Sequence, residues 1–287
     1  MSPPPSEGGV AVVTGASRGI GKGIAHELGL AGWTVYVTGR SRPDAPPIDG
    51  TRGTIDATAD LVTMAGGKGI AVELDHTDDD RVQALAEQIT EAQEGLDLLV
   101  NNVWGGYESY DPDAWNLEVW EQPVERWDKM FATGVRAHYT TTQALAPLML
   151  DRPRPLIVGI TAGDRGRYVG EVAYDVAKHA QARLCTALHH ALGPHGIHAV
   201  ALQSGFARTE RVLDAFEVDE TSWEQEPDLA ETHSTRYVGR LVLALYNAED
   251  LPDRSGGAHR AGDLGRAYGV TDVDGRAIAP FELPEDL

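Results

Sequence analysis

A tyrosine and a lysine four residues apart, Tyr174 and Lys178, open a segment with a helical pattern of apolar residues. Side chains at this spacing share one face of a helix, so the phenol and the ammonium group are expected to be neighbours. A nearby cation favours the phenolate and lowers the pKa of the phenol. Such a phenol can give a proton to a carbonyl oxygen while hydride adds to the carbon. The pair predicts carbonyl reduction or the reverse oxidation, although the spacing alone also fits a chance surface pair.

A glycine-rich turn, Thr14–Gly21, lies between a predicted strand and a predicted helix. Glycines let the backbone approach a pyrophosphate, and the amides at the N-terminus of a helix attract its negative charge. The flanking strand and helix make the pattern more specific than the glycines alone, although an ordinary glycine-rich turn is the alternative. The residues that we predict to bind a dinucleotide here are Gly15, Ser17, Arg18, Gly19, Ile20 and Gly21.

The second predicted strand is followed by Gly39, Arg40 and Ser41 and by no acidic residue. A carboxylate at this point would accept a hydrogen bond from the ribose 2′-hydroxyl of NAD(H) and would repel a 2′-phosphate. Arg40 and Ser41, with Arg18 nearby, instead offer donors for a phosphate, which favours NADP(H). A solvated loop charge is the alternative for Arg40.

Polar residues also follow the third and fourth predicted strands. Asp75 and His76 end the third strand, where an adenine could rest, and Asn101 ends the fourth. The carboxyl ends of parallel strands face the ligand crevice of open α/β sheets, so we expect all three to bind the cofactor. Simple turn formation is the competing interpretation for each of them.

Short apolar runs alternate with amphipathic helical stretches, which predicts βαβ units. The fold class expected is α/β: a single Rossmann-like, doubly wound parallel sheet with helices on both faces. The predicted strands are Val10–Thr14, Thr34–Thr38, Ile70–Leu74, Leu96–Val100, Leu156–Ile160 and Ile197–Leu202. Predicted helices lie near residues 20–28, 55–65, 124–149, 173–192 and 238–245, and at most one short strand is expected after Gly256.

Length and charge limit the organisation and the partners. The 287 residues, 42% of them hydrophobic, suffice for one domain, which we place at residues 10–287 after a flexible tail of residues 1–9. Residues 205–231 are expected to form a lid over the substrate. A net charge of −20 argues against nucleic acid and anionic membranes as partners. Cys185, the one cysteine, is expected in the core. We predict no metal site and a cytoplasmic protein.

On these motifs the chain resembles the short-chain dehydrogenase/reductase family, from about Val10 to Gly205. The resemblance rests on Thr14–Gly21, Asn101-Asn102, Tyr174 with Lys178, and Ser204-Gly205 through Thr209. It implies that Tyr174 is the general acid/base and that Lys178 lowers its pKa and binds the nicotinamide ribose. It also implies a homo-oligomer, and it places four residues beside the nicotinamide: Ser204, Gly205, Phe206 and Thr209.

The chain departs from the family pattern in three respects. The family usually has Asn-Asn-Ala-Gly after the fourth strand, whereas this chain has Val103 and Trp104 in the last two places. The family serine lies thirteen residues before the tyrosine, where Thr161 stands and is expected to donate to the substrate oxygen. Gly134 stands where many members carry an asparagine that supports a water relay to the lysine, so the relay is either rebuilt or absent. We expect a ring or the stem of Lys178 to pack against Gly134.

The function predicted is an NADP(H)-dependent oxidoreductase that interconverts a carbonyl and an alcohol on a small molecule. Aromatic residues near the predicted site favour an apolar substrate, with local packing as the alternative: Trp104, Tyr107, Tyr110, Trp115, Tyr168, Phe206, Phe216 and Trp223. Two other functions compete. One is a non-catalytic NADP(H)-binding regulator or scaffold, and the other is a lyase or epimerase on the same fold.

Overall fold

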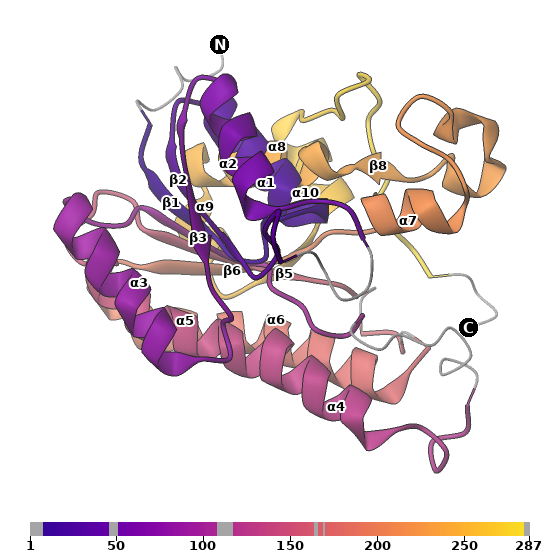
Figure 1. Ribbon diagram of the computed structural model, residues 1–287, viewed down its shortest axis with the longest axis horizontal. Helices are drawn as coiled ribbons and strands as arrows, with labels where there is room; N and C mark the ends of the chain where they lie inside the picture. Colours follow the sequence, from indigo (N-terminus) through magenta and orange to yellow (C-terminus); the bar gives the residue numbers. More distant parts are fainter. Residues whose placement is uncertain (1–7, 46–50, 108–116, 164–165, 169, 284–287) are drawn as a thin grey trace.

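A seven-stranded, fully parallel sheet forms the centre of the computed structural model, which describes residues 8–45, 51–107, 117–163, 166–168 and 170–283. Its strand order is β3-β2-β1-β4-β5-β6-β9, so the chain winds outward in both directions from β1 (Figure 1). The strands are β1 (Val10–Val13), β2 (Thr34–Gly39), β3 (Lys68–Glu73), β4 (Leu98–Asn101), β5 (Leu156–Thr161), β6 (His198–Gln203) and β9 (Ala258–Arg260). The doubly wound sheet expected from the sequence is confirmed.

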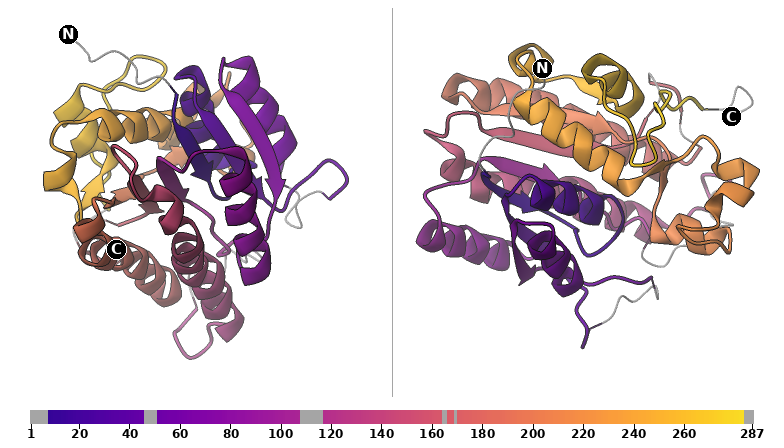
Figure 2. Two further views of the ribbon diagram at one scale, coloured as in Figure 1. Left: turned by 90° about the vertical axis from the view of Figure 1, so that its left-hand side faces the viewer. Right: turned by 90° about the horizontal axis from the view of Figure 1, so that it is seen from above.

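Helices cover both faces of this sheet (Figures 1 and 2). One face carries α1 (Gly19–Leu30), α2 (Ile55–Met64), α8 (Thr235–Asn247), α9 (Leu251–Arg254) and α10 (Ala261–Tyr268), and the other carries α3 (Asp79–Ala92), α5 (Ala137–Leu145) and α6 (Val172–Leu192). Buried side chains form a separate core against each face. The central strands β1, β4 and β5 are almost entirely apolar because both of their faces are covered.

The helix predicted for residues 124–149 is continuous but not uniform. It consists of α4 (Val124–Phe131), a π-helical turn at Ala132–Arg136, α5, and a 3₁₀ turn at Ala146–Met149. The π-helical turn contains Gly134, which is buried. Single π turns inside α-helices are frequent at functional sites.

The segment predicted as a lid is more ordered than its mixed composition suggests. It contains β7 (Ala207–Arg208), α7 (Glu210–Ala215) and two short 3₁₀ turns, and β7 pairs with β8 (His233–Ser234) in a small second sheet. Leu213, Trp223 and Leu229 form a local apolar cluster of its own. The segment therefore stands beside the carboxyl ends of the strands as a small packed unit (Figure 1).

Three of the sequence expectations need correction or completion. Helix α3 was not expected, because its apolar positions are few and its overall composition is polar. After Gly256 the single short strand was expected and is present as β9, but the helix α10 that follows was not. Residues 1–7 of the predicted tail lie outside the described part of the chain.

Candidate active site

The glycine turn between β1 and α1 brings the backbone close to the end of β4. Gly15 and Gly19 have φ angles of 62° and 56°, which favour glycine over other residues. A Cβ atom at Gly15 would lie 2.9 Å from Cα of Val103. The Thr14 hydroxyl accepts hydrogen bonds from the amides of Asn102 and Val103 at 2.8 and 3.0 Å. The turn is therefore tight and attached to β4, as a pyrophosphate site requires.

An acidic side chain from the lid segment contacts this turn. Glu210, the first residue of α7, accepts a hydrogen bond from the Gly19 amide at 2.7 Å and pairs with Lys22 Nζ at 3.0 Å. Gly19 is the first residue of α1, so the carboxylate occupies the positive end of that helix. Nothing in the motif around Thr14–Gly21 indicated this contact, because its two ends lie 191 residues apart.

The three residues predicted to select a 2′-phosphate converge beside the end of β2. Arg18 donates to the Ser41 hydroxyl at 2.5 Å, and Arg40 lies 3.5 Å from the Asp75 carboxylate. Asp75 also accepts hydrogen bonds from the amide and the hydroxyl of Thr77. These bonds and the Arg40 charge lower the pKa of Asp75 in spite of its partial burial. The cationic donors and one carboxylate thus share the rim of the site.

His76 and Asn101 lie in the interior. Both ring nitrogens of His76 have threonine partners, Thr38 at 2.7 Å and Thr141 at 2.8 Å, and burial lowers its pKa to about 4. Asn101 donates to the Thr142 hydroxyl at 2.9 Å. Both side chains connect the sheet to α5. This geometry favours the backbone, rather than the His76 ring, as the surface available to an adenine.

Tyr174 and Lys178 lie on one face of α6, as their spacing predicts. The start of α6 is fixed by Glu171, which is fully buried and accepts two hydrogen bonds from Arg126 at 2.8 and 2.7 Å. Burial raises the pKa of the Tyr174 phenol, and Tyr107 and Glu171 act in the same direction. Burial lowers the pKa of Lys178 to about 7. A buried phenol and a buried amine with perturbed pKa values are characteristic of catalytic sites.

Trp104 lies against both of these side chains. Lys178 Nζ is 3.6 Å from the centroid of the indole ring, and the Tyr174 ring meets it edge-to-face with centroids 5.6 Å apart. A Cβ atom at Gly134 would lie 2.6 Å from two carbons of the same indole. The expectation that a ring packs against Gly134 is confirmed. Sequence analysis named Trp104 among the aromatic residues near the predicted site and did not predict its contact with the lysine.

Thr161, at the end of β5, is buried and lies next to α6. Its hydroxyl donates to the backbone carbonyl of Lys178 at 2.7 Å. In this structure the hydroxyl therefore connects the strand to the turn of helix that carries the lysine. Donation to a substrate oxygen would require this proton to change partner.

The loop after β6 holds the residues predicted beside the nicotinamide. Ser204 is joined to β5 through its amide, which donates to the Thr161 carbonyl at 3.1 Å, and Gly205 has a φ angle of 76°. Thr209 lies at the other edge of the site, with its methyl group 3.4 Å from where a Cβ of Gly19 would be. Ser204, Gly205 and Phe206 also line a cavity of about 450 Å³, whose lining does not include Tyr174 or Lys178.

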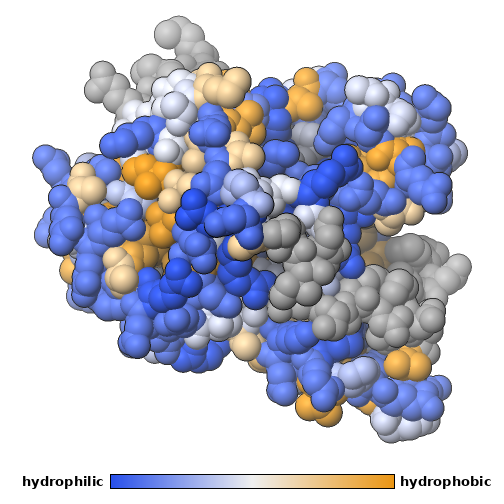
Figure 3. All heavy atoms as spheres, in the orientation of Figure 1, coloured by the Kyte–Doolittle hydropathy of each residue, from blue (hydrophilic) through white to orange (hydrophobic). Residues whose placement is uncertain are grey.

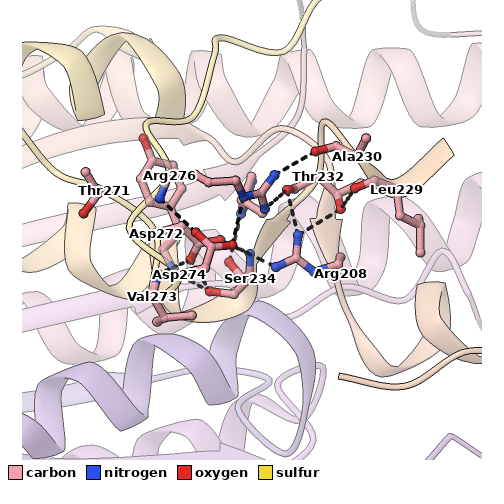
Figure 4. A network of polar contacts seen from close by, with 12 residues as sticks. Arg208, Leu229, Ala230, Thr232, Ser234, Thr271, Asp272, Val273, Asp274 and Arg276 are labelled. Carbon is pink, nitrogen blue, oxygen red and sulfur yellow. Dashed lines mark hydrogen bonds and ion pairs between the residues drawn. The ribbon is translucent and has the colours of Figure 1, made fainter. Parts of the chain in front are cut away.

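A buried polar network holds the base of the lid segment (Figure 4). Arg208 donates to the Thr232 carbonyl at 2.7 Å and lies 3.6 Å from the Asp272 carboxylate. Asp272 in turn accepts hydrogen bonds from the amide and hydroxyl of Ser234. Arg276 reaches the Ala230 and Thr232 carbonyls from the far side of the network. Both ends of the lid segment are thereby fixed to the loop that follows α10.

The aromatic residues named from the sequence occupy different places in the structure. Trp104 and Tyr107 lie by the site, and the Arg211 guanidinium is 4.7 Å from the centroid of the Tyr107 ring. Phe206 and Tyr168 are exposed, whereas Trp223 and Phe216 belong to the cluster inside the lid segment. Tyr110 and Trp115 lie outside the described residues. Two of the eight are thus structural.

The described residues contain no group of three or more potential metal ligands. None of the helices described is both long and apolar enough to cross a bilayer. Cys185 is buried, as expected, and burial raises the pKa of its thiol to about 12.

Comparison with known proteins places the site in context. A family model described as short chain dehydrogenase matches residues 9–220. The mouse and human proteins named dehydrogenase/reductase SDR family member 1 are each 35% identical to the chain, over 96% of it and 87% of their own length. The crystal structure of a short chain dehydrogenase from Mycobacterium thermoresistibile superposes with a TM-score of 0.80 at 24% identity, covering 96% of this chain and 95% of that one.

Proposed function

The chain belongs to the short-chain dehydrogenase/reductase family of oxidoreductases, which use a nicotinamide cofactor, and on this premise we propose that it is an NADP(H)-dependent carbonyl reductase or alcohol dehydrogenase. The single observation that carries the proposal is the placement of Tyr174 and Lys178 on one face of α6, beside Thr161 at the carboxyl end of β5 and Trp104 in the loop after β4. This is where ligands bind in open α/β sheets.

Three side chains take part in the proposed reaction. A bound nicotinamide would supply the hydride that adds to the carbonyl carbon. Tyr174 Oη gives its proton to the carbonyl oxygen, and Lys178 stabilises the phenolate that remains and holds the nicotinamide ribose. Thr161 is proposed to orient the substrate oxygen. In alcohol oxidation the same proton returns to Tyr174.

The dinucleotide itself would lie along the turn after β1. The backbone of Gly15, Ser17, Gly19, Ile20 and Gly21 would hold the pyrophosphate, while the loop of Ser204, Gly205, Phe206 and Thr209 would flank the nicotinamide. The rim residues Arg18, Arg40 and Ser41 would bind the 2′-phosphate, and Asp75, His76 and Asn101 would border the adenosine through their backbone. The residues present therefore fit this cofactor, because tight backbone and cationic donors stand where phosphates are expected.

Cofactor choice is tested by titrating the native protein and Arg40→Asp with NADPH and NADH. We expect the native protein to bind NADPH at least about tenfold more tightly, the factor that corresponds to 1.4 kcal/mol. Arg40→Asp should weaken NADPH binding because it places a carboxylate opposite the 2′-phosphate. Equal affinity of the native protein for the two cofactors would contradict NADP(H) dependence.

The acid is tested with a panel of ketones and aldehydes, followed by NADPH absorbance. Tyr174→Phe should abolish turnover and leave NADPH affinity nearly unchanged, because the phenyl ring still packs against Trp104. Activity close to the native level in this variant would assign the proton to another group. If the native protein binds NADPH but turns over none of the carbonyls, the alternative function, a non-catalytic NADP(H)-binding regulator or scaffold, would be favoured.

We also propose a cytoplasmic homo-oligomer. Phe131, Val135, Tyr139 and Leu184 form an apolar concavity on the outer surface of α4–α6, and the Tyr139 side chain is half exposed. Exposed apolar patches of this kind mark protein interfaces. The single buried cysteine is consistent with a reducing compartment.

A further inference from the structure

The ammonium group of Lys178 is held by an aromatic face. Its Nζ atom lies 3.6 Å from the centroid of the Trp104 ring, well inside the range of a cation–π contact, and the side chain is 8% exposed. In the part of the chain that the structure describes, no carboxylate forms an ion pair with Lys178. The titratable groups that face it are Tyr174 on its own helix and His138 on α5.

Neither of these two neighbours supplies a negative charge at neutral pH. Burial raises the pKa of the Tyr174 phenol, so the phenol is protonated. Burial and the Lys178 charge lower the pKa of His138 to about 3, so its imidazole is neutral. Burial also lowers the pKa of Lys178 to about 7. The indole face is thus the group positioned to favour the charged form of the amine.

The backbone around it fixes the Trp104 ring in one place. A Cβ atom at Gly134 would lie 2.6 Å from the indole, and one at Gly106 would lie 2.5 Å from it. The carbonyl of Gly134, in the π-helical turn, accepts a hydrogen bond from Gln181 Nε2 at 2.8 Å. Gln181 belongs to α6, one helical turn beyond Lys178. The same contacts that immobilise the ring therefore connect it to the helix that carries the lysine.

We propose that Trp104 is a positioning residue for Lys178, whose ammonium group it holds beside Tyr174, and that Gly134 is needed to make room for its ring. The inference rests on the proposed function, because it assigns Trp104 a part in preparing the proton donor. By keeping the amine charged, Trp104 maintains the cation that opposes the raised pKa of the Tyr174 phenol. The Trp104 ring thus fills the space that the missing side chain of Gly134 leaves open, and from there it contacts the lysine.

The chain offers a direct measurement, since it contains only four lysines: Lys22, Lys68, Lys129 and Lys178. Trace acetylation with acetic anhydride across a pH series, followed by peptide mass spectrometry, gives the titration midpoint of each amine. The native protein is compared with Trp104→Leu, which keeps the site apolar, and with Trp104→Phe, which keeps an aromatic face. No cofactor or substrate is added, so the result does not depend on whether the reductase activity is found.

In Trp104→Leu we expect the Lys178 midpoint to fall by about one pH unit, the size of a desolvated cation–π contact expressed as a pKa shift. Trp104→Phe should show a smaller fall, and the exposed Lys68 should keep its midpoint in every variant. A Lys178 midpoint that stays or rises in folded Trp104→Leu would overturn the proposal. Should that variant not fold, an unchanged midpoint in Trp104→Phe overturns it instead, because phenylalanine binds a cation less strongly than tryptophan.

Discussion

At the scale of single residues, Thr161 shows how a predicted role and an observed contact can differ. Its position was derived from a count back from Tyr174, and the structure places it beside α6, the helix that carries Tyr174. The direction of its hydroxyl could not be derived from spacing. The proton points to the Lys178 carbonyl, because the end of β5 packs directly against α6.

Replacing Thr161 with valine tests both roles of the hydroxyl. We expect turnover to fall about 100-fold, the cost of losing a transition-state donor, and the free energy of unfolding to fall by about 1 kcal/mol, the net value of one hydrogen bond. Thr161→Ser keeps a hydroxyl and should retain both. Steady-state rates and urea denaturation measure the two quantities. A valine variant with native turnover would show that the substrate oxygen is oriented by another group.

At the scale of elements, the helix from Val124 to Met149 shows what apolar periodicity misses. The periodicity predicted one long helix, and the helix is continuous. Its π-helical turn was not predictable, because it coincides with a glycine whose partner, Trp104, comes from a loop that follows β4. A helical glycine costs about 1 kcal/mol relative to alanine, and here the packed ring explains its presence.

Gly134→Ala should therefore destabilise the protein although alanine is the better helix former. The added methyl group would lie 2.6 Å from a rigid indole, and overpacking of this kind costs about 1–3 kcal/mol, which exceeds the gain in helix propensity. Thermal denaturation should show a lower Tm. The same substitution in a Trp104→Ala background is the control, and there alanine should be neutral or stabilising. A higher Tm for the single variant would refute the packing argument.

The contact between α7 and α1 gives a second prediction at this scale. The Glu210 carboxylate accepts the hydrogen bond of the Gly19 amide, where the pyrophosphate is proposed to bind. A bound cofactor would therefore have to displace this carboxylate. Glu210→Gln removes the charge and a charged hydrogen bond worth about 1.5–3 kcal/mol, so NADPH should bind about tenfold more tightly. Fluorescence titration measures the affinity. Glu217→Gln, an exposed change of equal charge just after α7, should leave it unchanged, and weaker NADPH binding in Glu210→Gln would contradict this model.

At the scale of the whole molecule, the surface is strongly polar, and Figure 3 shows mainly hydrophilic residues on the face in view. Against this background the apolar concavity on α4–α6 is distinctive. Its residues come from two helical segments of the chain, Phe131, Val135 and Tyr139 on one side and Leu184 on the other. Sequence analysis expected an oligomer by resemblance alone and had no surface to assign to it.

We expect oligomers to form through this concavity. Tyr139→Glu places a charge at its rim and should convert the oligomer to monomers, because burying an unpaired carboxylate in an apolar interface is costly. Light scattering coupled to size-exclusion chromatography gives the mass in solution. Leu150→Glu, at another exposed apolar position, serves as the matched control. A native protein that is monomeric at micromolar concentration, or a Tyr139→Glu variant with native mass, would contradict the assignment.

Local sequence determined much of this protein. The apolar runs defined most strands, and the glycines of the turn after β1 and the four-residue spacing of Tyr174 and Lys178 followed from requirements that act over a few residues. Helix α3 was missed because a mostly polar helix has only a weak apolar stripe. The tertiary structure decided which distant side chains share the site. Glu210 reaches Gly19, and Trp104 covers Lys178 and fills the space at Gly134, because sheet topology brings loop ends together that no local pattern relates.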